Sequence, residues 1–350
     1  MTELSDEIDI RTEGRAGRIT LNRPAALNAL TWDMCLRIEG ALDAWRGQDD
    51  VRLVLIDGAP GRAFCAGGDI VAMYQAGLER RWDYGQRFWA DEYRMNRKIR
   101  RYPKPVVSFL HGFTMGGGVG VGCHASHRVV DDSARIAMPE CAIGLVPDVG
   151  GSMLLARAPG RLGAFLGTKG HRMGPGDAVL AGFADHYVPE GWDALKDRLC
   201  GGGDTDEIAR AAAPVPAAPL ADWQAEVDAL FEGRTLAEVA RAVAEGDGPA
   251  AAAAREAFGR GSPLSLACTL EILDRLGPKP EIEAALEQEA RFTFRAAKHG
   301  DFLEGIRAQL IDRDRTPRWR HEGPGDVTAA EVDAMLAPLG ALTPDLGGTE

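Results

Sequence analysis

The chain has 350 residues, 45% of them hydrophobic, so it can bury a large core in two domains or in one domain with an extension. Its formal net charge of −12, with no long basic block to offset it, argues against a nucleic-acid binder. The acidic N-terminal stretch has no apolar segment typical of a secretory signal, and no run approaches the roughly 18–20 apolar residues that span a bilayer. We therefore expect a soluble, cytoplasmic protein that binds neither membranes nor nucleic acids.

The first half of the chain alternates strand and helix signals. Thr31 can cap a helix in which apolar residues recur at helical spacing from Met34 to Trp45, and residues 82–101 predict a charged amphipathic helix. Four short runs predict strands, at residues 17–22, 51–58, 105–112 and 127–132. Strand, glycine turn, helix and strand again are typical of stacked right-handed units, so we expect the α/β fold class.

The second part of the chain carries almost only helical signals. A stretch rich in glycine, alanine and proline over residues 200–223 predicts a connector. Beyond it come two capping boxes and a long alanine- and glutamate-rich helix, at Thr235-x-x-Glu238, Thr328-x-x-Glu331 and residues 280–298. We expect an α/β core over residues 1–190 and a helical C-terminal region over residues 191–350.

Two glycine-rich stretches each follow a predicted strand or an apolar segment, RAFCAGGDI at residues 62–70 and GFTMGGGVGVGC at residues 112–123. Glycine inside an element costs roughly 0.5–1 kcal/mol relative to alanine, so such runs indicate a close approach to the backbone. Freed N–H groups at two such turns could each donate to one developing anion, which is the arrangement of an oxyanion hole. Close packing of a helix on a strand is the alternative explanation. Neither stretch matches a phosphate loop or a dinucleotide-binding motif.

Two carboxylates, Glu140 and Asp148, lie in the otherwise apolar stretch AMPECAIGLVPDVGG at residues 137–151. A carboxylate in apolar surroundings has a raised pKa and can act as base, acid or nucleophile. The alternative is a loop carboxylate that caps a helix, which Asp148 could do for the Val-Gly-Gly segment that follows it. The sequence leaves both interpretations open.

Histidine and cysteine patterns do not indicate a metal site. His124 and His127 lie three residues apart, but no further ligand shares their spacing, so we expect no metal. The six cysteines contain no CxxC pair, which favours free and mostly buried thiols in a reducing compartment. No G-x-S-x-G motif supports a serine hydrolase of the α/β-hydrolase type.

Four stretches together resemble the crotonase (enoyl-CoA hydratase/isomerase) superfamily over residues 19–189: LNRPAALNALTWDM, AFCAGGDI, KPVVSFLHGFTMGGGVGV and MPECAIGLVPDVGG. The resemblance implies a crotonase-like spiral of ββα units that binds acyl-CoA esters over residues 1–190. It also implies that the backbone N–H groups of Gly68 and Gly117 hold the thioester oxygen. The CoA moiety is then expected along Ala66, Gly67, Asp69 and Ile70.

At one position this sequence differs from the enoyl-CoA hydratases, and the difference narrows the resemblance to one branch of the superfamily. Enoyl-CoA hydratases carry a catalytic glutamate where this chain has Gly120, whereas their second glutamate matches Glu140. What remains is similar to the 3-hydroxyisobutyryl-CoA hydrolase branch, including its C-terminal signature at residues 301–319. In that branch a glutamate on the long helix before the KP strand contacts substrate, and here it corresponds to Glu92.

The resemblance implies hydrolysis of the thioester of 3-hydroxyisobutyryl-CoA, a step of valine breakdown, without a cofactor because CoA belongs to substrate and product. Glu140 either attacks the carbonyl or activates a water, while Asp148 binds the substrate hydroxyl or orients Glu140. The alternatives are an enoyl-CoA hydratase or isomerase and a non-catalytic acyl-CoA-binding protein. Crotonases often form trimers or hexamers, and this chain could form such a homo-oligomer, but its extra C-terminal helices could also cover the surface that trimers use.

Overall fold

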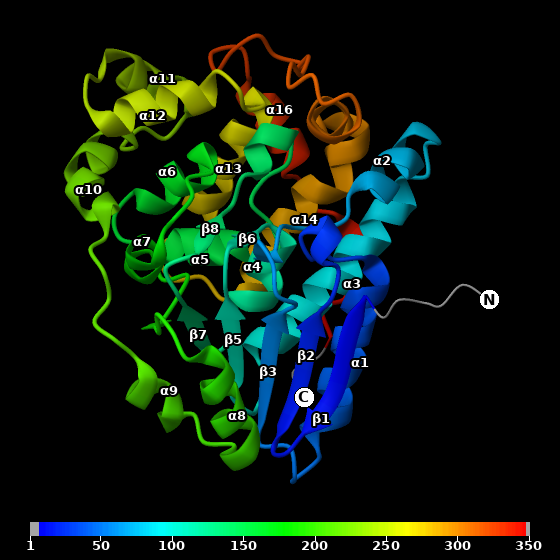
Figure 1. The fold of residues 1–350 in the computed structure, drawn as a ribbon. Coiled ribbons are helices and arrows are strands. Elements are labelled where there is room, and N and C mark those ends of the chain that lie inside the picture. The colour runs from blue at the N-terminus through cyan, green and yellow to red at the C-terminus, as the bar shows by residue number, and fades with distance from the viewer. Residues whose placement is uncertain (1–6, 348–350) are drawn as a thin grey trace. The chain divides into compact units, whose positions relative to one another are not determined.

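The computed structural model describes residues 7–347 (Figure 1). These residues form two compact units built from interleaved segments of the chain. The first, which we call the sheet unit, comprises the described residues up to Gly68, Met95–Ala137 and Arg172–Ala218. The second, the helical unit, comprises Asp69–Arg94, Met138–His171 and the described residues from Pro219 onward. Each unit is described by itself below.

The sheet unit contains two sheets. The larger one has the order β1-β2-β3-β5-β7-β9, and its strands are β1 (Ile8–Glu13), β2 (Ala16–Leu21), β3 (Leu53–Gly58), β5 (Val106–Leu110), β7 (His127–Val130) and β9 (His186–Tyr187). The smaller sheet consists of β4 (Ala63–Cys65), β6 (Phe113–Met115) and β8 (Arg135–Ala137). Only β1 and β2 pair antiparallel, and the other pairs are parallel. From β3 to β8, successive strands alternate between the sheets, which is the expected α/β spiral of ββα units.

The four strands predicted from apolar runs are confirmed as β2, β3, β5 and β7. In the smaller sheet, β4 confirms the buried strand expected directly before Gly67. β6 and β8 escaped prediction because three residues are too few to show a pattern, and pairing with their neighbours stabilises them. β1 also escaped prediction, although charged side chains alternate along this edge strand at Asp9, Arg11 and Glu13, because it continues the acidic N-terminal stretch and has only two apolar residues.

Helices cover the larger sheet. α1 (Trp32–Arg46) begins at Thr31, whose side chain accepts a hydrogen bond from the Met34 N–H, as predicted. Gly17 of β2 lies against the ring of Trp45, where a Cβ would come within 2.3 Å of a ring carbon. α8 (Trp192–Gly202) and α9 (Asp206–Ala211) bury apolar side chains against strand residues such as Leu55 and Phe109. The predicted connector over residues 200–223 is therefore wrong in part, because α9 and the start of α10 (Pro219–Leu230) fall within it.

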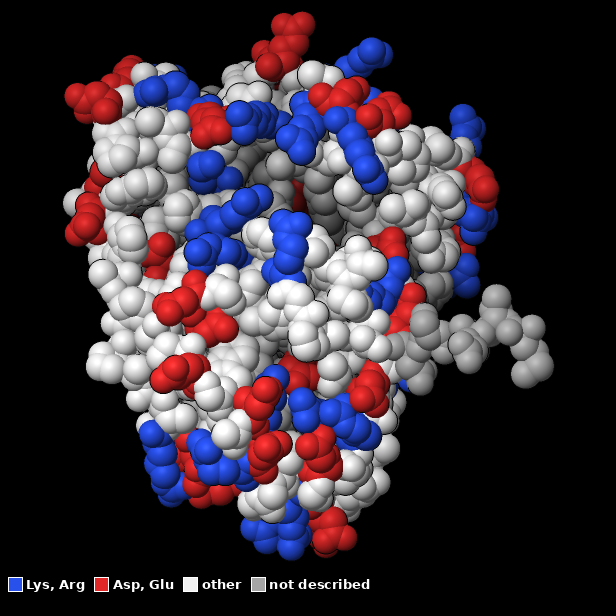
Figure 2. All heavy atoms as spheres, in the orientation of Figure 1, with Lys and Arg blue, Asp and Glu red and all other residues white. Residues whose placement is uncertain are grey.

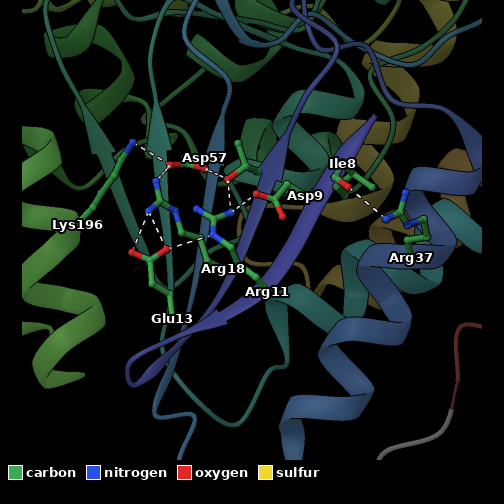
Figure 3. A network of polar contacts seen from close by, with 9 residues as sticks. Ile8, Asp9, Arg11, Glu13, Arg18, Arg37, Asp57 and Lys196 are labelled. Carbon is green, nitrogen blue, oxygen red and sulfur yellow. Dashed lines mark hydrogen bonds and ion pairs between the residues drawn. The ribbon is translucent and has the colours of Figure 1, made fainter. Parts of the chain in front are cut away.

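A polar network lies on the larger sheet and includes the nearly fully buried Asp57 of β3 (Figure 3). Its carboxylate contacts Arg18 of β2 at 2.8 Å and Lys196 of α8 at 2.9 Å, and it accepts a hydrogen bond from Thr20 at 2.7 Å. The ammonium group of Lys196 also lies 5.0 Å from the ring centre of Phe109. The network fastens α8 to the sheet.

The helical unit contains the remaining long helices. Its main elements are α2 (Val71–Leu78), α3 (Trp82–Arg100), α5 (Gly151–Arg157), α6 (Leu162–Lys169), α10, α11 (Leu236–Glu245), α12 (Pro249–Phe258), α13 (Pro263–Leu276), α14 (Ile282–His299), α15 (Phe302–Ile306) and α16 (Ala329–Met335). Of α3, only the part up to Arg94 belongs to this unit. α13 packs against α5, α6, α14 and α16 and forms the centre of the unit's core. Both capping boxes, at the starts of α11 and α16, are confirmed.

Beyond β9, every element among the described residues is helical, as expected for the C-terminal part. The expected boundary between residues 190 and 191 stays a prediction, since the compact units interleave along the chain. In the described part of the chain, no helix is long and apolar enough to cross a membrane. All six cysteines are free and buried.

Charged side chains of both signs are interspersed over the face shown in Figure 2 in the region of β1, β2, α8 and α9. Many of them form exposed or half-exposed ion pairs, among them Arg11–Asp9, Arg198–Glu207 and Arg210–Glu207. Such pairs contribute little to stability, typically about 0–1 kcal/mol each. In this region of the surface, they neutralise charge locally instead of building a continuous field of one sign.

Candidate active site

The two glycine turns of the sheet unit follow neighbouring strands. β4 and β6 are parallel, with Cys65 paired to Thr114, so the turns that follow them leave the same edge of the smaller sheet. Gly67 has a φ of +119°, and its carbonyl accepts a hydrogen bond from the Leu30 N–H. Among the described residues, no acceptor is found for the N–H groups of Gly68 and Gly117. The structure therefore brings these two predicted amides to adjacent turns.

The glycine run itself forms a short helix, α4 (Gly117–Gly122), which the glycine content did not predict. A Cβ on Gly118 would come within 2.2 Å of the Cys65 carbonyl oxygen, and one on Gly122 within 2.5 Å of Leu110. Close packing on β4 and β5 therefore requires glycine at these two positions. The packing explanation is confirmed for Gly118 and Gly122, and it is compatible with free amides at the start of the helix.

The residues expected along the CoA moiety divide between the units. Ala66 and Gly67 belong to the sheet unit, where the Ala66 N–H donates to the Leu27 carbonyl at 3.0 Å. Asp69 and Ile70 belong to the helical unit, where Ile70 precedes the first residue of α2. Their binding role stays a prediction.

Three predicted carboxylates lie in the helical unit and are almost fully buried: Glu92 on α3, Glu140 at the start of the short 3-10 helix η2 (Glu140–Ile143), and Asp148. Burial raises the pKa of Glu92 and of Glu140 well above the ordinary value, and the neighbouring Asp148 raises both further. Oε1 of Glu92 and Oε2 of Glu140 have no hydrogen-bond partner among the described residues. Both side chains thus present a polar atom that a substrate could engage.

Asp148 is held by a tyrosine that the sequence did not single out. The hydroxyl of Tyr93, itself fully buried, donates to Oδ2 of Asp148 at 2.9 Å and lies 3.2 Å from Oγ1 of Thr293 on α14. Burial raises the pKa of Asp148 to about 7, although the bond from Tyr93 works in the opposite direction. The pKa of Asp148 therefore lies much closer to neutral pH than that of an exposed aspartate.

A fourth buried carboxylate, Glu289 of α14, also escaped prediction. It accepts hydrogen bonds from the Gly150 N–H at 2.8 Å, from the Ser152 N–H at 3.0 Å and from the Ser152 hydroxyl. Burial raises its pKa to about 8, while its bond from Ser152 works against that rise. Glu289 thus supplies the acceptors for the N-terminus of α5, and Asp148 does not cap this helix, so the capping alternative for Asp148 is wrong.

The C-terminal signature packs directly on the segment that carries Glu140. A Cβ on Gly305 of α15 would come within 2.1 Å of the Ile143 carbonyl oxygen, and one on Gly144 within 2.5 Å of the Asp301 backbone. Asp301 is buried and accepts a hydrogen bond from the Ser262 hydroxyl at 2.7 Å. The signature therefore packs against η2, the short helix that begins at Glu140.

These four carboxylates share an unusual environment. None of them pairs with a lysine, arginine or histidine in the described part of the chain, and beyond burial Asp148 raises the pKa of each of the other three. Uncompensated buried carboxylates with raised pKa values are suited to proton transfer or nucleophilic attack near neutral pH. No group of three or more metal-binding side chains is found among residues 7–347.

The family model and the relatives that match this sequence are described as enzymes of acyl-CoA esters. The sequence matches the family model described as enoyl-CoA hydratase/isomerase over residues 16–336. The Mus musculus protein named 3-hydroxyisobutyryl-CoA hydrolase, mitochondrial, is 35% identical over 347 residues, which cover 96% of this chain and 90% of that protein. The Homo sapiens protein of the same name is 33% identical over a matched region that covers 97% of this chain and 91% of that protein.

Two solved structures share the fold over nearly the whole chain. A crystal structure of an enoyl-CoA hydratase from Rhodobacter sphaeroides 2.4.1 has a TM-score of 0.92 and 55% identity, and covers 97% of this chain and 100% of that chain. A carnitinyl-CoA dehydratase from Mycobacterium thermoresistibile has a TM-score of 0.92 and 42% identity, and covers 98% of this chain and 99% of that chain. Both confirm the α/β spiral with its helical C-terminal part.

Proposed function

Since the chain belongs to the enoyl-CoA hydratase/isomerase family, we propose that it is an acyl-CoA thioester hydrolase whose substrate is 3-hydroxyisobutyryl-CoA. The observation that carries the proposal is the pair of residues 120 and 140. Gly120 is buried inside α4 at the position where hydratases are expected to have a catalytic glutamate, while Glu140 is present and buried. Relatives named 3-hydroxyisobutyryl-CoA hydrolase at 33–35% identity support it.

In the proposed reaction, the N–H groups of Gly68 and Gly117 polarise the thioester carbonyl and stabilise the oxyanion of the tetrahedral intermediate. Glu140 either attacks the carbonyl carbon, giving a mixed anhydride that water then cleaves, or takes a proton from a water that attacks directly. In both routes the C–S bond breaks, CoA leaves as its thiolate and takes up a proton, and water supplies the second oxygen of the carboxylic acid. Neither route needs a metal or a further cofactor.

The remaining carboxylates select the acyl group in this proposal. Asp148, with a pKa of about 7, binds the 3-hydroxyl of the substrate or orients Glu140, and Glu92 holds the same end through its unpartnered oxygen. A buried site built to bond a hydroxyl disfavours an analogue that lacks it, because its polar groups are then left unpaired. The CoA moiety is assigned to Ala66, Gly67, Asp69 and Ile70.

A second candidate, an enoyl-CoA hydratase, is favoured by the 55% identity to the Rhodobacter sphaeroides protein described as one. Hydration of an enoyl thioester places water across a double bond and is expected to use two carboxylates, of which the one at position 120 is absent here. This absence makes hydrolysis the first proposal.

The test compares two reactions of the wild-type protein. Release of free CoA from 3-hydroxyisobutyryl-CoA is followed with a thiol reagent, and hydration of crotonyl-CoA is followed by the loss of enoyl-thioester absorbance. We expect CoA release to dominate and hydration to be negligible. Hydration at a rate equal to or above CoA release would overturn the proposal in favour of the hydratase. Tight binding of CoA esters without either reaction would favour a non-catalytic binding protein.

Gly120→Glu sharpens this test. The new side chain would place a charge inside the packed helix α4, where an unpaired buried charge is costly. We therefore expect the variant to lose CoA release without gaining hydration. A variant that hydrates crotonyl-CoA would instead show that position 120 alone separates the two reactions.

The proposal extends to the setting of the reaction. Cleavage of 3-hydroxyisobutyryl-CoA belongs to valine breakdown, and we propose that pathway, a cytoplasmic location and a homo-oligomer of trimeric or hexameric form. The vertebrate relatives are named as mitochondrial proteins. Sedimentation of the purified protein measures the oligomer directly.

A further inference from the structure

Glu289 lies in the middle of α14, is fully buried and has no cationic partner among the described residues. Its carboxylate accepts from the N–H groups on both sides of Gly151, with Oε2 bonded to Gly150 and Oε1 to Ser152. Both oxygens therefore face donors, and the Ser152 hydroxyl adds a third. A carboxylate can accept at both ends, whereas a glutamine of the same length would place an NH₂ group against one of these donors.

The segment that Glu289 holds is conformationally strained. Val149 has a φ of +55°, a region that a β-branched side chain rarely adopts, and Gly150 follows at +78°. Such a backbone costs on the order of 1–3 kcal/mol and persists only where the surroundings enforce it. Glu289 accepts hydrogen bonds from residues that follow Val149 directly, so these bonds are placed to enforce the turn.

This turn sets the position of Asp148. Asp148 immediately precedes Val149, and its carbonyl accepts a hydrogen bond from the Gly151 N–H at 2.7 Å. Its side chain accepts a hydrogen bond from the Tyr93 hydroxyl through Oδ2. If the turn relaxed, the backbone of Asp148 would rotate and its carboxylate would leave the place that Tyr93 defines.

We propose that Glu289 is a positioning residue for the reaction: it holds the strained turn at Val149–Ser152 and thereby fixes where Asp148 presents its carboxylate. The inference rests on the proposed function, because the effect of Glu289 is measured as the rate of thioester hydrolysis. Glu289 does not need to touch the substrate. A helix of the C-terminal part thus controls the geometry of a carboxylate in the Glu140–Asp148 loop.

A matched glutamate separates positioning from ordinary capping. Glu226 of α10 is half-buried and accepts from the N–H groups of Ala250 and Ala251, at 3.2 and 2.9 Å, at the start of α12. Its bonds resemble those of Glu289, but none of them involves the segment that carries Asp148. Glu226→Gln therefore reports what the loss of a helix-capping carboxylate does to stability alone.

The experiment is a double-mutant cycle with Glu289→Gln, Asp148→Asn and the combination, measured as kcat/KM for CoA release and accompanied by thermal unfolding. Gln presents an NH₂ group to one of the two N–H donors, so we expect Glu289→Gln to lower kcat/KM by about 10–100-fold, the range for lost hydrogen bonds to a charged group. In the Asp148→Asn background, we expect the same change to lower it by no more than about twofold, because the groups act through one another. Glu226→Gln should lose thermal stability but stay within about twofold of wild-type kcat/KM.

Two results would overturn the inference. One is that Glu289→Gln lowers kcat/KM by the same factor in the wild-type and in the Asp148→Asn background. The other is that the loss of kcat/KM equals the fraction of the variant that is unfolded. If Glu289→Gln does not fold, Ser152→Ala removes only the hydroxyl donor, and its smaller loss of about 3–10-fold should likewise vanish in the Asp148→Asn background. If the wild type hydrates crotonyl-CoA instead of releasing CoA, the proposed function fails, and the same cycle measured on hydration still decides the role of Glu289.

Discussion

Two buried aspartates, one in each unit, have pKa values shifted in opposite directions. Asp57 of the sheet unit is 2% exposed and lies between Arg18 and Lys196, as Figure 3 shows. Asp148 of the helical unit is 4% exposed and is held by the hydroxyl of Tyr93, with no cation. Burial alone would raise both pKa values, but Lys196, Thr20 and Arg18 hold that of Asp57 below the ordinary value, whereas that of Asp148 rises to about 7.

The difference separates a carboxylate that fastens structure from one that can exchange protons. With two cations beside it, Asp57 stays ionised at physiological pH and contributes to stability there. Without a cation, Asp148 and its neighbours Glu92, Glu140 and Glu289 are costly to ionise, and such clusters are typical of functional sites. The following predictions test this contrast, from the largest expected effect to the smallest.

Glu140→Gln should lower CoA release by about 10²–10⁴-fold while leaving the fold intact, because it removes a positioned base or nucleophile but keeps the shape of the side chain. Single-turnover and steady-state kinetics, with circular dichroism as the folding control, measure the effect. Turnover near the wild-type rate would exclude Glu140 from the chemistry.

Asp57→Asn should destabilise the protein by about 3 kcal/mol with little effect on kcat, since it leaves Arg18 and Lys196 facing each other without their shared carboxylate. Denaturant unfolding at pH 7 measures the loss. Because the folded pKa of Asp57 is depressed, its contribution is present above the unfolded value near 4 and disappears as the pH falls below it. The difference between variant and wild type should therefore shrink in acid.

Asp148→Asn should have the opposite effect on stability. The folded pKa of Asp148 is raised to about 7, so between about pH 4 and 7 the unfolded chain has released a proton that the folded chain retains, and wild-type stability falls as the pH rises. Asparagine removes this penalty and still accepts from Tyr93. We expect a gain on the order of 2–3 kcal/mol at pH 8, and little gain at pH 4, in denaturant unfolding.

The same variant should lose activity, and more so with 3-hydroxyisobutyryl-CoA than with isobutyryl-CoA if Asp148 binds the substrate hydroxyl. Equal losses with both esters would assign it to the orientation of Glu140 instead. A variant that is more stable but less active marks Asp148 as a residue retained for function.

Tyr93→Phe should give the smallest effect. It removes one hydrogen bond to Asp148 and leaves the buried ring in place, so we expect a loss of less than about tenfold in kcat. The bond lowers the pKa of Asp148, so its removal should shift the acid limb of the pH–rate profile to higher pH. An unshifted profile would contradict the assigned contact.

The sequence predicted the parts of the molecule that local patterns define. Thr31 and the two capping boxes mark helix starts through a single side chain and a fixed spacing, and all three are confirmed. The apolar stretch around Glu140 and Asp148 indicated burial and raised pKa values, which the structure bears out. The catalytic roles themselves stay proposals.

What escaped prediction depends on long-range contacts. Glu289 bonds to Gly150 across 139 positions, and no local motif links the two. One signal was present: Glu289 follows Ala285 and Leu286 at helical spacing and precedes Thr293, so it falls on the buried face of α14. A charged residue on an apolar helix face requires a buried partner, and that requirement could have identified it.

The distance along the chain between the Asp148 turn and its anchor also has a consequence for the order of synthesis. At about 5–20 residues per second, a ribosome needs roughly 7–28 s to proceed from Gly150 to Glu289. During that interval Val149 and its neighbours lack the acceptors that enforce their strained backbone, and the face of α5 that α13 and α14 later cover is open. The nascent chain therefore completes its cluster of four buried carboxylates only after α14 has been made.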